Sequence, residues 1–157
     1  MDSASAWQYF NTVFKRVSLA MSHRPFYYQY LLNTFAVHFD DNVQHIEIRA
    51  LCGTGGLGDL TDLSGAVYSG NAVIETYREA LAEFKGASDS ARAGFTLKLI
   101  VSSLRVLGED RIEGDVKEAL RLKVDNGDLI VGFDIVAEED PNHRTLDYID
   151  EILELKR

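Results

Sequence analysis

The sequence has few of the residues that would tie a small protein together or attract it to a polyanion. A single cysteine, Cys52, excludes an internal disulfide framework and any zinc site built on two or more cysteines. The 157 residues hold 16 Lys and Arg against 25 Asp and Glu, a net charge of −9. This balance argues against nucleic-acid partners and polybasic membrane attachment, because both need a basic footprint.

Long apolar segments are also missing. No apolar run approaches the roughly 20 residues that are needed to cross a bilayer. The N-terminal residues lack the basic and apolar regions of a signal peptide. What remains is an acidic globular chain, 46% hydrophobic, with the length of one domain or of part of a larger one.

Two helices are predicted in the N-terminal quarter. Residues 7–21 place apolar side chains at spacings of three and four, which is one face of a helix. A second helix over about 25–39 begins at Pro25, a residue well suited to the first helical turn. Its expected buried side consists of Phe26, Tyr27, Tyr30, Leu31, Phe35 and Phe39.

The remainder alternates between strand and helix patterns. Strands are predicted over 43–51, 95–102 and 129–136, and helices over about 71–85, 110–124 and 144–155. This order is typical of right-handed parallel β/α units.

Each predicted strand has one apolar face and one polar face. The apolar faces are Ile46 and Ile48; Leu97, Leu99 and Val101; and Val131, Phe133 and Ile135. Strands of a doubly wound sheet are apolar on both faces, whereas the interior of a barrel can hold charges that pair across strands. The pattern therefore favours a barrel and predicts an interior network of Glu47, Lys98 and Asp134.

Three strands cannot close a barrel, since a (β/α)8 barrel takes about 250 residues. The predicted fold class is α/β: a partial (β/α)8 TIM-type barrel with two N-terminal helices and then about three parallel β/α units. Residues 1–157 are expected to form part of one barrel domain, with unpaired edges on the outer strands.

Two loop motifs each have two interpretations. Residues 53–58 fit G-x-G-x-x-G, but the next helix begins only near Asn71, and Asp59 and Asp62 would repel phosphate, so a surface loop is favoured over a dinucleotide site. Glu138, Glu139 and Asp140 follow the third strand, where barrel enzymes place their site loops. They fit acid–base or metal chemistry, or a solvated acidic loop that caps the next helix.

The histidines and the cysteine form no recognisable catalytic pattern. His23 and His38 are expected on helix surfaces or ends, and His45 on the inner face beside Glu47. His143 is the histidine near the expected site loops. Cys52 is expected to be a buried or semi-buried thiol.

Four ordered blocks carry a family resemblance. They are Arg24-Pro-Phe-Tyr-Tyr-Gln-Tyr30, Asp41-Asn-Val43 leading into Ile46-Glu-Ile-Arg-Ala50, Ser102 to Arg105, and Val131-Gly-Phe-Asp-Ile-Val-Ala-Glu-Glu-Asp140. In order and spacing the chain resembles the secreted adenosine deaminase growth factors, the extracellular type 2 adenosine deaminases. The resemblance implies a zinc-dependent (β/α)8 barrel that hydrolyses adenosine to inosine and ammonia, of which this chain holds the second to fourth strands.

The family's catalytic motifs are absent here. The resembling enzymes use an H-x-H, an H-A-G-E, a later histidine and an Asp-Asp pair. Neither histidine motif occurs in this sequence, and its one Asp-Asp, Asp40-Asp41, lies in the turn predicted before the first strand and not in a late catalytic segment. The resemblance therefore implies zinc and adenosine for the parent protein, but no catalytic residue and no metal ligand in this chain, which we expect to be inactive alone.

Two residues match substrate-binding positions of the family. Glu47 matches a glutamate that holds the ribose, although an interior ion pair with Arg49 or Lys98 would explain it equally well. Ala137 takes the place of a glycine whose backbone N–H meets the purine ring. Leu104 stands where the family can carry a substrate-contacting histidine, and Ala72 where it can carry a tryptophan over the ribose.

Two other functions remain open at this stage. Changes at Leu104 and Ala72 would suit a non-catalytic binding or growth-factor-like relative of the same fold. The glycine loop would suit an unrelated nucleotide-binding protein. By resemblance, an extracellular location and a homodimer are expected of the parent protein.

Overall fold

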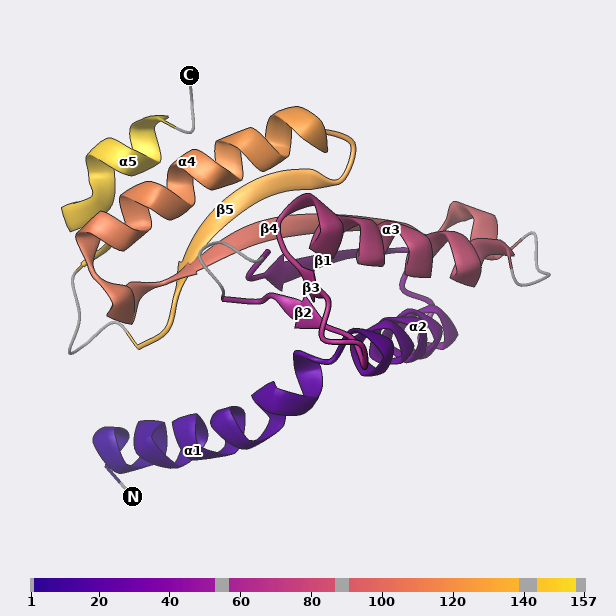
Figure 1. Ribbon diagram of the computed structural model, residues 1–157, viewed down its shortest axis with the longest axis horizontal. Helices are drawn as coiled ribbons and strands as arrows, with labels where there is room; N and C mark the ends of the chain where they lie inside the picture. The colour runs from indigo at the N-terminus through magenta and orange to yellow at the C-terminus, as the bar shows by residue number, and fades with distance from the viewer. Residues whose placement is uncertain (1, 53–56, 87–90, 139–143, 155–157) are drawn as a thin grey trace.

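The computed structural model describes residues 2–52, 57–86, 91–138 and 144–154 (Figure 1). The α-helices and strands, in chain order, are α1 (Ser3–Met21), α2 (Arg24–Asp40), β1 (His45–Ala50), β2 (Leu60–Thr61), β3 (Val67–Tyr68), α3 (Asn71–Gly86), β4 (Thr96–Leu104), α4 (Glu109–Asp125), β5 (Ile130–Val136) and α5 (Ile149–Glu154). The short 3-10 helices within these ranges are η1 (Arg92–Gly94), η2 (Arg105–Leu107) and η3 (Thr145–Tyr148).

The predicted parallel sheet is confirmed. Its strand order is β1-β4-β5, and both pairs are parallel, with α3 and α4 in the connections. In the register, Glu47 lies opposite Lys98, and Ser102 lies opposite Asp134. A right-handed connection through a helix is the usual way to join parallel neighbours.

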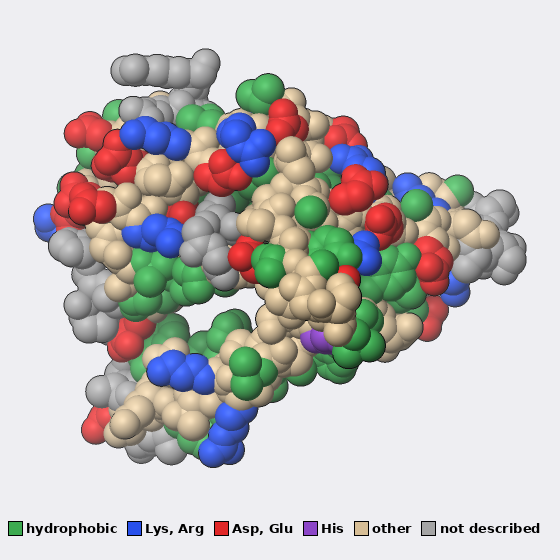
Figure 2. All heavy atoms as spheres, viewed as in Figure 1, with side chains coloured by type: hydrophobic (Ala, Val, Ile, Leu, Met, Phe, Trp, Pro, Cys, Tyr) green, Lys and Arg blue, Asp and Glu red, His purple; other side chains and the backbone are tan. Residues whose placement is uncertain are grey.

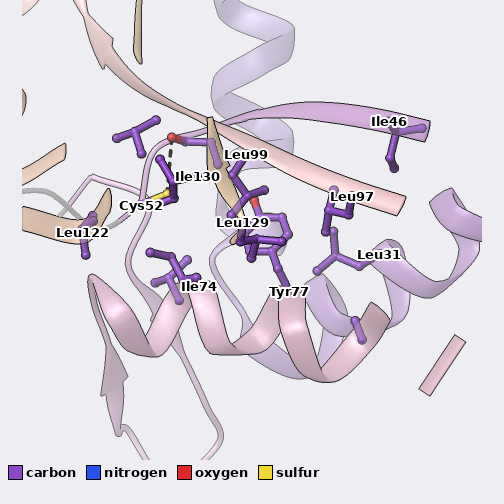
Figure 3. Packing of buried hydrophobic residues seen from close by; sticks show 14 of the residues in the cluster. Leu31, Ile46, Cys52, Ile74, Tyr77, Leu97, Leu99, Leu122, Leu129 and Ile130 are labelled. Atoms are coloured by element: carbon purple, nitrogen blue, oxygen red, sulfur yellow. Dashed lines mark hydrogen bonds between the residues drawn. The ribbon is translucent and has the colours of Figure 1, made fainter. Parts of the chain in front are cut away.

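Helices cover one face of this sheet. Side chains from α2, α3 and α4 join the apolar side chains of the strands in one core cluster, part of which is seen in Figure 3. Leu99, at the centre of β4, is completely buried there. On the opposite face Glu47 and Arg49 are exposed. This layering is that of one side of an α/β barrel, so the expected fold class is confirmed.

Aromatic rings fill the end of the core between α2, α3 and the start of β4. Phe84 and Phe95 lie 5.2 Å apart between ring centroids, in an edge-to-face arrangement, and Phe35 and Phe39 contact both rings. Such pairs add about 0.5–1.5 kcal/mol beyond the burial of apolar area.

The expected buried side of α2 is partly wrong. Leu31 and Phe35 are buried, but Phe26 and Tyr30 are 49% and 47% exposed. Since α3 packs along one side of α2, where the Tyr27 and Tyr77 hydroxyls share a hydrogen bond, the other aromatic side chains extend beyond the covered part.

One strand position also differs from the prediction. Val131, expected on the apolar face, is 42% exposed. The register shifts between Leu99 and Ile100, which lie opposite Ile130 and Gly132. Val131 is thus the extra residue of a β-bulge, and a bulge turns its side chain away from the alternation.

The antiparallel hairpin of β2 and β3 was not predicted. Its turn is held by Asp62, which accepts hydrogen bonds from the Ser64 hydroxyl, the Tyr68 hydroxyl and the Ala66 and Ser64 amides. These bonds, that of the Ser64 hydroxyl first, lower the pKa of Asp62 to about 2. The predicted last helix, 144–155, is divided between η3 and the short α5.

The first helix, α1, extends away from the sheet and is in contact mainly with α2 (Figure 1). Its apolar stripe is exposed: Phe10, Phe14 and Val17 are 52%, 59% and 50% accessible. Figure 2 shows a hollow between α1 and the rest of the molecule with hydrophobic side chains on both sides. None of the helices within the described ranges is both long and apolar enough to span a membrane.

The central role of Leu99 in the core can be tested by truncation. We expect Leu99→Ala to lower the free energy of unfolding by about 3–5 kcal/mol, because it leaves a cavity between β4 and the helices. The matched substitution Leu63→Ala, at a position 90% exposed, should change it by less than about 0.5 kcal/mol. Urea unfolding followed by circular dichroism gives both values, and equal effects would contradict this description of the core.

Candidate functional site

The candidate site is the edge of the sheet at which the three parallel strands end. β1 ends at Ala50, β4 at Leu104 and β5 at Val136. In α/β barrels the loops after the strands build the active site, because the carboxyl ends of all parallel strands meet on one side. The described residues at this rim are Leu51 and Cys52, the helix η2, and Ala137 and Glu138.

The polar face of the sheet carries a different charge network from the predicted one. Asp134 pairs with Arg49, whose Nε lies 2.5 Å from Oδ2 of the carboxylate. The Lys98 ammonium donates to the Asp128 carbonyl oxygen at 2.5 Å. The predicted network of Glu47, Lys98 and Asp134 is therefore wrong, because each of these side chains reaches another partner.

Glu47 is within ion-pair distance of a histidine on its own strand. His45 Nε2 lies 3.6 Å from the Glu47 carboxylate, and the other ring nitrogen, Nδ1, is 2.6 Å from the Thr96 hydroxyl. Side chains two residues apart on a strand share a face, so this pairing follows from the pleat. The Glu47 side chain is 49% exposed, which leaves the carboxylate accessible from the inner face.

The two predicted substrate-binding residues lie at different levels of the sheet. Glu47 is opposite Lys98, whereas Val136, just before Ala137, is opposite Leu104. Six residues of β4 separate these levels, or about 20 Å of strand at about 3.3 Å per residue. The structure therefore brings Ala137 to the rim and leaves Glu47 on the inner face below it.

Ala137 has an unusual backbone conformation. Its φ is +100°, in a region that glycine adopts readily and alanine rarely. A non-glycine residue held there stores about 1–3 kcal/mol of strain. The family resemblance places a glycine at this position, and the conformation is the one for which glycine is suited.

The positions of Leu104 and Ala72 differ in their relation to the rim. Leu104 is the last residue of β4 and is partly buried opposite Val136. Two apolar side chains thus stand side by side where the strands end, and neither forms hydrogen bonds. Ala72 lies in the first turn of α3 and is exposed.

Several motif residues fall outside the part of the chain that the structure describes. They are residues 53–56 of the glycine motif, Glu139 and Asp140 of the acidic motif, and His143. The described end of the glycine motif leads into β2 and not into a helix. A side chain at Gly58, where φ is +79°, would collide with the Leu51 carbonyl, so glycine is needed there for backbone packing.

The other histidines and the cysteine have structural environments. His23 occupies the N-cap position of α2, and His38 Nδ1 is bonded to the Thr34 carbonyl at 2.8 Å, so the expectation of helix ends and surfaces is confirmed. Cys52 is completely buried, and this burial raises the pKa of its thiol to about 12. Within the described ranges, no three His, Cys, Asp or Glu side chains come together as a metal site.

Three buried polar side chains near the end of β4, those of Ser103, Asp115 and Arg105, were not predicted from the sequence. The Ser103 hydroxyl donates to Asp115 of α4 at 2.5 Å, and Arg111 binds the same carboxylate at 2.8 Å. Arg105, only 2% exposed, lies directly after the strand. Arg105 could have been found from the sequence, because it is a charged residue that follows an apolar strand and belongs to the resembling block from Ser102 to Arg105.

Taken together, the one-sided parallel sheet and its rim define part of an α/β barrel with the site position of that class of enzymes. No family model matches the chain. Curated proteins do match it. Adenosine deaminase 2 of Sus scrofa is 28% identical over 143 residues, which is 90% of this chain and 26% of that protein. The Dictyostelium discoideum and Homo sapiens proteins of the same name are 26% and 27% identical, over 99% and 90% of this chain.

These matches confirm the family resemblance. The chain is similar to the adenosine deaminase 2 proteins along almost all of its sequence, and it spans about a quarter of the length of those it matches.

The strain at Ala137 can be tested by its effect on the stability of the folded chain. We expect Ala137→Gly to raise the free energy of unfolding by about 1 kcal/mol. Glycine removes the strain of the positive φ, and this gain is larger than the backbone entropy that glycine loses on folding. The same change in the middle of α4, Ala119→Gly, should lower it by about 1 kcal/mol or more. Chemical denaturation of both variants measures the two free energies of unfolding. A loss of stability in Ala137→Gly would show that the conformation is not strained.

Proposed function

We propose that this chain is a segment of a hydrolytic adenosine deaminase and forms one wall of its nucleoside pocket. The similarity to proteins named adenosine deaminase 2, over 90–99% of the chain, carries this proposal. The rim at which β1, β4 and β5 end supports it, because this is where a barrel enzyme binds its substrate. The names of these relatives favour a deaminase over a non-catalytic binding module.

The reaction replaces the 6-amino group of adenosine by oxygen from water, giving inosine and ammonia. It needs an activated water, an acid to protonate the purine, and a pocket that orients the nucleoside. The part of the chain described here offers no group of ligands that fits zinc, so no step through a metal is assigned to it. We infer that the zinc and the acid–base residues of the parent lie outside this segment, and that the segment alone is inactive.

The role left to this chain is to bind and orient substrate. At the rim, the Ala137 N–H would donate to the purine ring, and the apolar side chains of Leu104 and Val136 would exclude water beside it. Glu47 would accept a hydrogen bond from a ribose hydroxyl. Since about 20 Å of strand separates the levels of Glu47 and Ala137, one nucleoside would reach both only where the tilt of strands in a closed barrel brings the two levels together.

The remaining expectations concern the parent protein. Adenosine as ligand, an extracellular location and a homodimer are proposed from the family resemblance, and the acidic composition accords with an absence of nucleic-acid and membrane partners.

The proposal can be tested on the native protein. An antibody raised against this chain should isolate from the source organism a protein that converts adenosine to inosine. A chelator should abolish this activity and added zinc should restore it, while the recombinant 157-residue chain should form no inosine with or without zinc. Native protein that has no turnover under zinc would overturn the proposal, and turnover by the recombinant chain would overturn its inactivity.

A substitution in the native-length enzyme tests the role of Glu47. Glu47→Gln should lower kcat/KM for adenosine by about 10- to 100-fold, mainly through KM, because a hydrogen bond to a charged group contributes about 1.5–3 kcal/mol. With 2′,3′-dideoxyadenosine the change should be small.

The matched variant His45→Gln removes the neighbour of Glu47 but not its carboxylate, so it should leave KM nearly unchanged. Equal losses with both nucleosides, together with a lower Tm, would show that Glu47 serves only the charge network of the sheet.

A further inference from the structure

The strained conformation of Ala137 has to be held by its surroundings. A residue with positive φ persists only where the contacts on both sides of it fix the backbone, because relaxation would release about 1–3 kcal/mol. Ala137 lies in the connection that leaves β5 at Val136 and reaches η3 at Thr145. The groups that hold the two ends of this connection therefore decide the direction of the Ala137 N–H.

Arg105 contacts both ends. One nitrogen of its guanidinium, NH2, donates to the Ile135 carbonyl at 3.4 Å, two residues before Ala137. The same nitrogen donates to the Thr145 hydroxyl at 3.2 Å, at the start of η3. Both bonds are at the long end of the usual range, but they converge on a single buried nitrogen. This guanidinium thus joins two points of the chain ten residues apart in sequence.

The guanidinium itself is fixed from a third direction. Its central carbon lies 6.0 Å from the ring centroid of Tyr148, which is completely buried. Tyr148 packs with Ile135 of β5 and with Ile112 and Val116 of α4 in the second core cluster. Because Arg105 directly follows β4 and contacts both the end of β5 and η3, its side chain has little conformational freedom.

We propose that Arg105 is a positioning residue of the substrate pocket. By bonding both Ile135 and Thr145, it holds together the two ends of the connection between β5 and η3, and thereby keeps Ala137 at positive φ with its N–H in one direction. The assignment of this N–H to the purine rests on the proposed function; the mechanical link between Arg105 and Ala137 does not. A guanidinium is suited to this role, because it can donate to several fixed acceptors at once.

A double-mutant cycle tests the link. Ala137→Gly should lower the unfolding equilibrium constant about fivefold in the wild-type chain, where Arg105 enforces the strain. In a Thr145→Val or Arg105→Met background, the bond between Arg105 and Thr145 is lost. There the same substitution should change the unfolding equilibrium constant less than twofold. Arg105→Lys, which keeps the charge on a shorter side chain, should give an intermediate value.

The controls separate positioning from general stability. Arg111→Met removes a different partly buried guanidinium, which binds Asp115 of α4, and in that background Ala137→Gly should retain its full fivefold effect. Thr145→Val leaves the buried charge in place, so the cycle can be completed even if Arg105→Met does not fold. The NMR resonances of Ala137 should shift in Thr145→Val while those of α3 stay in place.

Additive effects of Ala137→Gly in the Thr145→Val and Arg105 backgrounds, with unshifted Ala137 resonances, would overturn the proposal. The cycle uses no substrate, so its failure leaves the deaminase assay unaffected. A failed deaminase assay likewise leaves the link between Arg105 and Ala137 standing.

Discussion

The parallel pairing of β4 with β1 on one side and with β5 on the other is the constraint on which the rest of the structure depends. Because strand side chains alternate, this register places Leu97, Leu99 and Val101 against the helices and Lys98 on the opposite face. It also sets the level at which each strand ends, and therefore which residues meet at the rim. A slip by one residue would exchange the buried and the polar faces.

The polar face shows how the same segment would differ inside a closed barrel. Arg49 and Asp134 form an ion pair across β4 with side chains that are 63% and 38% exposed, where such a pair contributes about 0–1 kcal/mol. If further strands enclosed this face, the two charged side chains would no longer contact water. Removing one of them would then leave the other charge buried without a partner. In the same way, further parts of a larger structure would cover the exposed apolar stripe of α1 and fill the hollow beside it.

The rim combines a strained backbone with a rigid support. Ala137 departs from the conformation that alanine prefers, and the buried Arg105 holds the chain on either side of it. Leu104 beside Val136 makes this part of the rim apolar. The described part of the rim thus offers backbone groups and apolar side chains more than charged side chains.

Local periodicity was sufficient to predict α1 to α4, the three strands of the parallel sheet, their order and the barrel class, because burial on one face imposes a repeat on the sequence. The ordered blocks were sufficient to predict the similarity to the adenosine deaminase 2 proteins. Tertiary structure decided the remainder: the bulge that exposes Val131, the exposure of Tyr30, the pairing of Asp134 with Arg49, and the bonds of Arg105. Each of these depends on which residues from distant segments meet, and a repeat along one segment holds no information about its partner.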